Sequence, residues 1–315
     1  MARFVTRRVL TMLLMLFAIS VVTFVLFIVA LPGGNPAAMI AGRLATPTEV
    51  HLISVRYGFD KPIYIQYLHT MANIFDGNAF SYQQGFNVLS QLGGDAPATL
   101  SLAIGAGILW LLSSIALGTL AAIRSGKYTD RVLTVLSMVG VSLPPFLLGA
   151  VLIQYVGYKA SVIPLGNYVS LAHPAQWLWH MLAPWFTLSV LFIGFYSRVL
   201  RGSILDAMGE DYVRTARAKG LSERKVLVKH ILRMSLLPIV SLWGLDVAQV
   251  IGGGAILTET VFNLHGIGWQ AAQSIGNFDT VTLLTIVMIT ALAVVVIGAL
   301  VDILYAVLDP RIRLA

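Results

Sequence analysis

Six apolar stretches, each long enough to cross a lipid bilayer, constrain the fold of this chain more than any other feature of its sequence. A helix needs about 20 apolar residues to cross the hydrocarbon core of a membrane. Of the 315 residues, 57% are hydrophobic and 11% are charged, which excludes a soluble domain. Because lipid offers no partners to backbone polar groups, we expect these stretches to be helices. The sequence therefore predicts an all-α polytopic membrane protein with six transmembrane helices, at residues 9–31, 99–123, 132–156, 183–199, 236–257 and 281–308.

The positions of the Lys and Arg residues predict which side of the membrane each loop faces. If the N-terminus is inside, 17 of the 21 basic residues fall in cytoplasmic segments and four fall outside. Cytoplasmic loops of membrane proteins carry such an excess of Lys and Arg. We therefore expect both termini in the cytoplasm. The net charge of +7 is then a topology signal, and the chain has no separate basic domain to bind nucleic acid.

The loops divide the chain unequally. The first apolar stretch is about 23 residues long, well beyond the core of a cleaved signal peptide, so we expect it to be retained. We predict an N-terminal segment with the first helix (1–31), an extracytoplasmic loop region (32–98) and a core with five helices (99–315) that includes a cytoplasmic loop at 200–235. Within the loop region, residues 63–71 have an amphipathic pattern, which predicts a helix that lies on the membrane or packs on the spans.

The sequence carries no motif of a self-sufficient pump or enzyme. It contains no Gly-x4-Gly-Lys-Ser/Thr nucleotide loop, no Gly-x-Ser-x-Gly nucleophile motif and no cysteine. Its six histidines never fall at the spacing of a helical metal site. We expect no catalytic residue, no metal site and no cofactor in this chain.

An acidic residue inside an apolar stretch is a functional candidate, because burying its charge in lipid costs about 2.5–3.5 kcal/mol. Asp246 lies near the middle of the fifth stretch. The segment that follows this stretch, residues 259–280, is predicted to form an outer loop. Two interpretations of Asp246 stay open: it faces a translocation cavity, or it pairs with a polar group inside the helix bundle. In a cavity, it would offer a negative charge to a cationic group such as a peptide amino terminus or a bound metal.

Proline and glycine mark where the predicted helices break. Pro144 and Pro145 interrupt the third stretch and should kink it, with Ser142 bonding a freed carbonyl. Three consecutive glycines leave part of the fifth stretch bare of side chains, which suits close helix packing and also a narrow, flexible section of a pathway. The candidate pathway residues are Asp246, Gly252, Gly253, Gly254 and Pro144.

One polar segment, residues 210–225, separates the fourth and fifth apolar stretches. Residues 212–219 are good helix formers, and Gly220 accepts the left-handed conformation of a helix end. Ser222 suits the N-cap of a second helix that continues to Arg233. The segment is therefore predicted to fold as a helix, a glycine break and a second helix.

The apolar side chains of this segment, Val213, Ala216 and Leu221, are predicted to dock into a hydrophobic cleft of a cytoplasmic partner, framed by arginines. The alternative is a solvated loop that obeys the positive-inside rule. That alternative explains the charge, but it does not explain the small and apolar residues or the glycine break. We therefore favour a docking element.

Thr215-Ala216-Arg217-Ala218-Lys219-Gly220-Leu221, followed by Ile231 and Leu237-Pro238, resembles the cytoplasmic EAA-type motif of binding-protein-dependent ABC importer permeases. Within that group, the chain is similar to the dipeptide/oligopeptide/nickel permease family. The resemblance covers nearly the whole chain, through six stretches in the family's order: 31–36, 57–62 with 66–67, 97–100, 211–220, 302–305 and 309–311.

The resemblance implies a type I-like ABC importer permease fold in the bacterial cell (inner) membrane. In that family, the polar segment forms a coupling helix in a groove of a cytoplasmic ATPase subunit, which binds ATP and Mg²⁺ and hydrolyses the ATP. Two permease subunits pair, usually as different chains, and an extracytoplasmic binding protein delivers the substrate. The residues thereby implied in ATPase coupling are Arg214, Thr215, Ala216, Arg217, Ala218, Lys219, Gly220 and Leu221.

The implied function is ATP-driven import of di- and oligopeptides by alternating access, with this chain forming half of the pathway. Nickel chelates, glutathione-like compounds and haem are the alternative cargoes. The sequence departs from the family pattern at Arg214-Thr215-Ala216, in place of Glu-Ala-Ala, and at Asn263-Leu264-His265-Gly266, in place of Trp-Pro-Gly. Asp246 also stands where an uncharged residue is usual, so the departures affect the expected substrate more than the expected role.

Two other classes of membrane protein stay open. A self-contained secondary transporter would need ionisable pairs in its spans, and Asp246 is the one acid well inside a predicted span. A structural or assembly protein would not need kinked, glycine-broken spans. Co-purification of an ATPase with the chain separates both classes from an importer permease.

Overall fold

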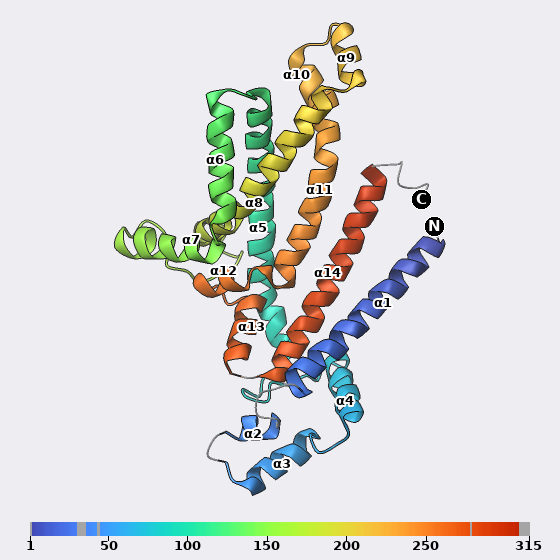
Figure 1. The fold of residues 1–315 in the computed structure, drawn as a ribbon. Coiled ribbons are helices and arrows are strands. Elements are labelled where there is room, and N and C mark those ends of the chain that lie inside the picture. The colour runs from blue at the N-terminus through green and yellow to red at the C-terminus, as the bar shows by residue number, and fades with distance from the viewer. Residues whose placement is uncertain (1, 30–35, 43–44, 278, 309–315) are drawn as a thin grey trace. The chain divides into compact units, whose positions relative to one another are not determined.

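The computed structural model describes residues 2–29, 36–42, 45–277 and 279–308, and these are mostly helical (Figure 1). The described residues form no β-strand, so the all-α prediction is confirmed. Among the described residues, five helices are long and apolar enough to cross a membrane, and there are six candidates if the bent pair Tyr128–Ser142 and Pro145–Lys159 counts as one span. Parts of two stretches that carry the family resemblance lie outside the described residues: 31–35 and 309–311.

The chain divides into two compact units. Unit 1 comprises Met1–Pro97 and His265–Val295, and unit 2 comprises Ala98–Leu264 and Val296–Ala315. Two long helices, α5 (Val88–Ile123) and α14 (Thr280–Leu308), each begin in unit 1 and end in unit 2.

In unit 1, the amphipathic helix predicted at 63–71 is confirmed as α4, which packs against α1. The Tyr67 hydroxyl of α4 lies 2.7 Å from Ser20 Oγ, and the Tyr67 ring meets Phe24 edge-on with centroids 5.3 Å apart. Packing on a span was one of the two predicted placements of this helix. Besides α5 and α14, the elements of unit 1 are α1 (Ala2–Phe24), the π-helical turn η1 (Val25–Val29), α2 (Pro36–Ala41), α3 (Pro47–Tyr57), α4 (Ile63–Phe75) and α13 (Ile267–Gly276).

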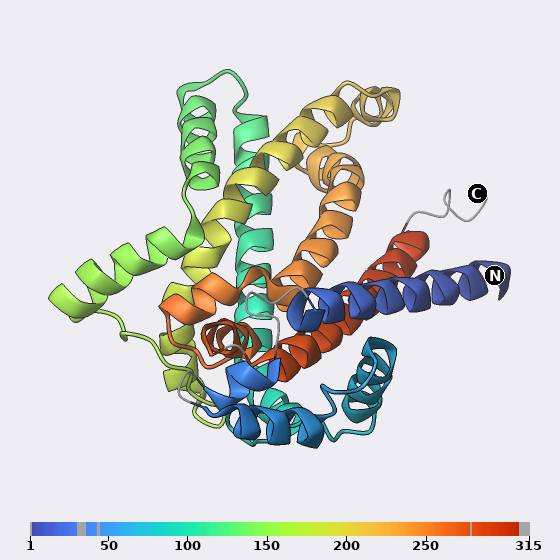
Figure 2. The same cartoon turned by 60° about the horizontal axis from the view of Figure 1, so that its bottom comes forward.

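Unit 2 carries the segments that the sequence singled out for function. Figures 1 and 2 show that the turn from α5 to α6 lies at the same end of this unit as α9 and α10, whereas α7 and α12 lie at the other end. Its elements are α6 (Tyr128–Ser142), α7 (Pro145–Leu152), η2 (Ile153–Lys159), α8 (Pro174–Met208), α9 (Asp211–Ala218), α10 (Glu223–Val226), η3 (Leu227–Ile231), α11 (Leu232–Gln249), η4 (Val250–Gly254) and α12 (Ile256–Val261).

Small residues on α5 let two tryptophan indoles reach its backbone. The Trp185 indole of α8 donates to the Ser101 carbonyl at 2.8 Å, and the Trp243 indole of α11 donates to the Gly107 carbonyl at 2.8 Å. The ring of Trp185 occupies the space that a side chain at Gly105 would need. The contact therefore requires glycine on α5, and it holds α8 and α11 against the same helix.

Helices α6 and α8 pack antiparallel, and their backbones approach each other as closely as α8 approaches α5. Gly194 of α8 lies against the Ser137 backbone, and a Cβ placed on Gly140 of α6 would come within 3.0 Å of the Val190 carbonyl. Later residues of α6 thus meet earlier residues of α8. Glycine on both helices brings the two backbones together, as small residues do between membrane helices.

The kink predicted at Pro144 and Pro145 is confirmed, and it is a sharp bend of 94° between the two helices that it separates. Pro144 is extended, with φ −61° and ψ 129°, and Pro145 begins α7, where a missing N–H costs nothing. The Ser142 hydroxyl donates to the Met138 carbonyl at 2.9 Å, as expected from the sequence. Two prolines in succession thus turn α7 away from the direction of α6.

The close approach of α5 to α8 predicts that Gly118→Ala destabilises the protein. A Cβ at Gly118 would lie 2.8 Å from the Ser197 carbonyl, so the two helices must move apart, at a cost of about 1–3 kcal/mol. We expect a lower melting temperature by scanning fluorimetry of the purified protein. Gly202→Ala is the matched control, because a Cβ there meets no atom within 4 Å. Equal melting temperatures in the two variants would contradict this account of the packing.

Candidate functional site

The polar segment between the fourth and fifth apolar stretches folds as two short helices around a glycine (Figure 1). Helix α9 ends at Ala218, and α10 begins at Glu223 after the extended residue Ser222. Gly220 has a φ of +77°, in the left-handed region that favours glycine. The predicted helix, break and second helix are confirmed, although the Ser222 side chain makes no capping hydrogen bond.

An ion pair bridges the glycine break. Arg217 Nε lies 2.9 Å from Glu223 Oε1, and Arg217 Nη2 lies 3.2 Å from Glu223 Oε2. Both side chains are solvated, so the pair adds about 0–1 kcal/mol to stability. Its two parallel bonds nevertheless constrain the angle between α9 and α10, because a guanidinium holds a carboxylate in one plane.

The apolar face of the segment is turned inward, which corrects one prediction. Val213 and Ala216 have exposed fractions of 0% and 5%, and α9 packs against α10 and η3. Val226 and Ile231 on those elements are also buried. The prediction that Val213 and Ala216 dock into a partner is therefore wrong: these side chains hold the segment together, because a short helix gains stability by burying its apolar face in its own chain.

The surface that the segment does present is polar and basic. Burial raises the pKa of Tyr212 at the start of α9, and the charge of Glu210 adds to this effect. Leu221 is half-buried beside the glycine break. Of the residues predicted for ATPase coupling, the exposed ones are Arg214, Thr215, Arg217, Ala218, Lys219 and Gly220.

Two long helices hold the segment at its base. The Ser203 hydroxyl of α8 lies 3.4 Å from the Ser235 carbonyl of α11, and the Ser235 hydroxyl lies 3.2 Å from the Ser203 carbonyl. Ile204 and Ile239 are fully buried beside this exchange. This exchange therefore joins α8 and α11 next to the α9–α10 segment.

Asp246 has a partner on a neighbouring helix. The Tyr196 hydroxyl of α8 donates to Asp246 Oδ2 of α11 at 2.5 Å. Tyr196 is fully buried, whereas Asp246 is half-buried. The structure thus contains the pairing inside the bundle that was one of the two interpretations, and the role of Asp246 in a pathway stays a prediction. An acid in an apolar stretch signals that a partner exists, but its spacing does not identify Tyr196.

The other candidate pathway residues precede two helices, α7 and α12, that pack together at the opposite end of unit 2 (Figure 1). Gly253 has a φ of +126° and breaks the helix, and α12 follows Gly254 after one residue. Helix α7, which Pro144 precedes, packs against α12, where Gly149 lies close to Phe262. The proline bend and the glycine break therefore lie on neighbouring elements, whereas Asp246 lies on α11 and faces α8.

Two buried acids were not predicted from the sequence, because residues 259–280 were expected to form an outer loop. Glu259 is fully buried and accepts from Thr99 Oγ1 at 2.7 Å. Asp279 is 4% exposed and accepts from Thr282 Oγ1 at 2.7 Å. The apolar residues around Glu259 were the available signal of burial. In the part of the chain that the structure describes, no three His, Asp or Glu side chains gather as metal ligands.

Comparison with known families decides what the chain is. The family described as "Binding-protein-dependent transport system inner membrane component" matches residues 114–314, and its N-terminal counterpart matches residues 1–103. The chain belongs to this family. This permease is therefore a multi-pass inner membrane component of an ABC importer, and the family implies a substrate-binding protein and an ATPase as partners.

Named relatives resemble the permease over nearly its full length. It is 38% identical over 292 residues to the "Probable peptide ABC transporter permease protein y4tP" of Sinorhizobium fredii (strain NBRC 101917 / NGR234), covering 92% of this chain and 93% of that protein. It is 33% identical over 314 residues to the "Glutathione transport system permease protein GsiC" of Escherichia coli (strain K12), covering 99% of each.

A solved ABC importer shares the fold. The permease aligns with a chain of the inward-facing MetNI methionine ABC transporter with a TM-score of 0.57 and 16% identity, covering 70% of this chain and 97% of that chain. A second crystal form of the same transporter gives a TM-score of 0.57 and 15% identity. The permease thus has an ABC importer permease fold.

The left-handed glycine predicts that Gly220→Val lowers substrate-stimulated ATP hydrolysis by the assembled importer. A β-branched residue at this φ costs about 1–2 kcal/mol and distorts the angle between α9 and α10. The variant should still insert, because no apolar stretch is changed. Gly85→Val is the control, since Gly85 has a φ of +72° and, like Gly220, no atom within 4 Å of an added Cβ. Normal membrane levels with unimpaired stimulated hydrolysis in Gly220→Val would reject the coupling role of the segment.

Proposed function

We propose that this chain is one of two permease subunits of an ATP-driven peptide importer, and that its α9–α10 segment receives a cytoplasmic ATPase subunit. The observation that carries the proposal is the segment itself, an exposed basic surface on a helical hairpin whose apolar side is buried in its own chain. Anchoring two spans in lipid does not need such a hairpin. Membership of a binding-protein-dependent family supports the same assignment.

For the topology, we propose six spans with both termini in the cytoplasm. The bent pair α6 and α7–η2 supplies the sixth span. Between residues 98 and 264, 12 of the 13 Lys and Arg lie near the α5–α6 turn or between 198 and 233, at the end of unit 2 that carries α9 and α10. This distribution supports a cytoplasmic position for the coupling loop at 200–235. The loop region at 32–98 then faces the binding protein outside.

The mechanism that we propose is alternating access driven by the partner ATPase. ATP and Mg²⁺ bind to that partner, and this chain has no catalytic role. Closure of the ATPase subunits moves α9 and α10, and the serine exchange at their base passes the movement to α8 and α11. Two similar permease subunits, as different chains, enclose the pathway, so the movement opens it to one side of the membrane at a time.

Peptides are the cargo that the relatives favour. One relative is named as a peptide permease and another as a glutathione permease, and glutathione is itself a short peptide. We propose Asp246, Gly252, Gly253, Gly254 and Pro144 as pathway residues. The half-buried carboxylate of Asp246 suits the amino terminus of a passing peptide, because opposite charges attract more strongly in a partly dehydrated cavity than at a surface.

The proposal is tested by assembling the importer from the genes beside this one and measuring uptake in proteoliposomes. We expect an ATPase to co-purify with the chain and labelled di- and oligopeptides to accumulate only with ATP and the binding protein. A variant ATPase that binds but does not hydrolyse ATP is the control. Uptake driven by an ion gradient without ATP would support a secondary transporter instead, and uptake of nickel chelates or haem without peptides would correct the cargo.

The position of Asp246 predicts that Asp246→Asn shifts the charge preference of transport. The asparagine oxygen still accepts from Tyr196, so we expect an unchanged yield of assembled complex. Loss of the negative charge should reduce uptake of peptides with an extra cationic group relative to neutral and anionic ones. Competition uptake assays with peptides of matched length measure this preference. Unchanged preference with a poorer yield would assign Asp246 to structural pairing and remove it from the pathway.

A further inference from the structure

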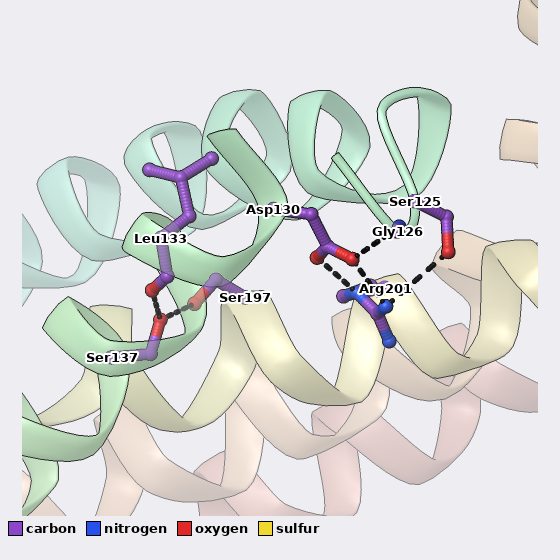
Figure 3. Close-up of polar contacts among 7 residues, drawn as sticks. All are labelled: Ser125, Gly126, Asp130, Leu133, Ser137, Ser197 and Arg201. Carbon is purple, nitrogen blue, oxygen red and sulfur yellow. Dashed lines mark hydrogen bonds and ion pairs between the residues drawn. The ribbon is translucent and has the colours of Figure 1, made fainter. Parts of the chain in front are cut away.

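Besides the serine exchange, a second polar connection in unit 2 joins α8 to α6 and to the α5–α6 turn (Figure 3). It lies at the end of the unit that carries α9 and α10 (Figure 1). Arg201 of α8 donates from Nε to Asp130 Oδ1 and from Nη2 to Asp130 Oδ2, each at 2.7 Å. The Gly126 backbone N–H donates to Asp130 Oδ2 at 2.9 Å, and Arg201 Nη2 lies 3.4 Å from Ser125 Oγ. One carboxylate and one guanidinium therefore join the start of α6, the α5–α6 turn and α8.

Stability alone is a weak reason for this pair. The Asp130 side chain is 7% exposed and the Arg201 side chain is 29% exposed. Taking two charges out of water costs so much that apolar residues of similar volume often serve stability equally well. What a bidentate pair provides is geometry, since two parallel bonds prevent both sliding and rotation of one partner against the other.

The pair lies close to the proposed coupling segment. Arg201 precedes the end of α8 at Met208 by seven residues, about two helical turns. Asp130 lies in the first turn of α6, directly after a turn in which Gly126 has a φ of +78°. The same end of unit 2 carries α9 and α10 (Figures 1 and 2). A movement of α9 that travels along the chain therefore reaches Arg201 through the last two turns of α8, before it reaches the earlier residues of that helix.

The connection continues along α6 toward the other end of the unit. Ser137 Oγ lies 3.0 Å from Ser197 Oγ, one turn of α8 from Arg201 (Figure 3). The glycine contacts at Gly140 and Gly194 then bring the helices together. Beyond the proline bend, α6 leads into α7, which packs against α12. The part of α8 near Arg201 is thus linked through α6 and α7 to α12, the helix that follows the glycine break.

We propose that Arg201 and Asp130 are a positioning pair that makes α6 move with α8 when the ATPase displaces α9 and α10. This inference rests on the proposed function, in which the α9–α10 segment receives that displacement. Without the pair, α8 slips along α6, so ATP is hydrolysed while α7 and α12 stay in place. The pair therefore sets how much transport each hydrolysed ATP produces.

Arg201→Lys tests the geometry while the charge is kept. A lysine offers a point charge in place of the planar fork, so the fixed angle is lost. We expect normal complex yield and basal ATP hydrolysis, with about a tenfold fall in peptide taken up per ATP, the change expected from one charge-assisted hydrogen bond. Arg198→Lys is the matched control, since Arg198 is an exposed arginine on the same helix. A wild-type ratio of uptake to hydrolysis in Arg201→Lys would overturn the inference.

A reversible lock tests whether α6 and α8 move together. The chain has no cysteine, so Ser137→Cys with Ser197→Cys provides one defined disulfide between the helices. In the Arg201→Lys background, we expect the oxidised lock to restore uptake per ATP and reduction to abolish the restoration. If Arg201 served folding alone, oxidation of the disulfide would not restore uptake per ATP and reduction would not remove it. Loss of uptake when the lock is oxidised in an otherwise unchanged permease would show that α6 must slide on α8, and would overturn the proposal.

The two levels of failure are distinguishable. If the unaltered complex shows no ATP-dependent uptake, the proposed function fails and this inference fails with it. If the unaltered complex transports and Arg201→Lys matches it, the positioning pair alone is rejected.

Discussion

Two tryptophan indoles that donate to the backbone of α5 are the contact on which the arrangement of unit 2 depends. Trp185 brings α8 to α5 and Trp243 brings α11 to α5, and the Ser189 hydroxyl adds a bond to the Ala106 carbonyl at 3.1 Å. Among apolar helices the hydrophobic effect does not select one packing over another, because lipid tails are as apolar as the side chains. An indole N–H left without an acceptor there is costly, so these bonds select the arrangement. The α9–α10 segment is in turn carried by the two helices that the indoles hold.

The α9–α10 segment presents a charged surface and is held together by contacts within its own chain. Its apolar side chains join it to η3, its glycine sets the angle between the helices, and Arg217 bridges the break. A segment held in this way moves as one piece. If the segment receives an ATPase subunit as proposed, its exposed basic face suits a partner with complementary charge, and the apolar cleft that the sequence suggested is not required. In the proposed function, specificity for the ATPase would then come from electrostatic complementarity and shape more than from apolar burial.

Local chemistry made part of this structure predictable from the sequence. Hydropathy predicts the helices, the left-handed preference of glycine predicts the break at Gly220, and the lack of an N–H in proline predicts the bend at Pro144. Contacts between distant segments were not predictable, because spacing along one helix does not say which face meets which neighbour. The partner of Asp246, the burial of Glu259 and the inward turn of Val213 all depend on such contacts. The same reason hid the Arg201 and Asp130 pair, whose members lie 71 residues apart.

The π-helical turn η3 lies between the short helix α10 and the long helix α11 and contains one residue more than an α-helical turn would. A π turn closes its hydrogen bond over five residues and holds one more residue than an α turn. Its conversion to α-helix shifts the preceding chain by one residue, about 1.5 Å along the axis and about 100° around it. A change of hydrogen-bond partners within η3 can therefore let α10 move on that scale relative to α11, while α11 keeps its own hydrogen bonds and moves with α8.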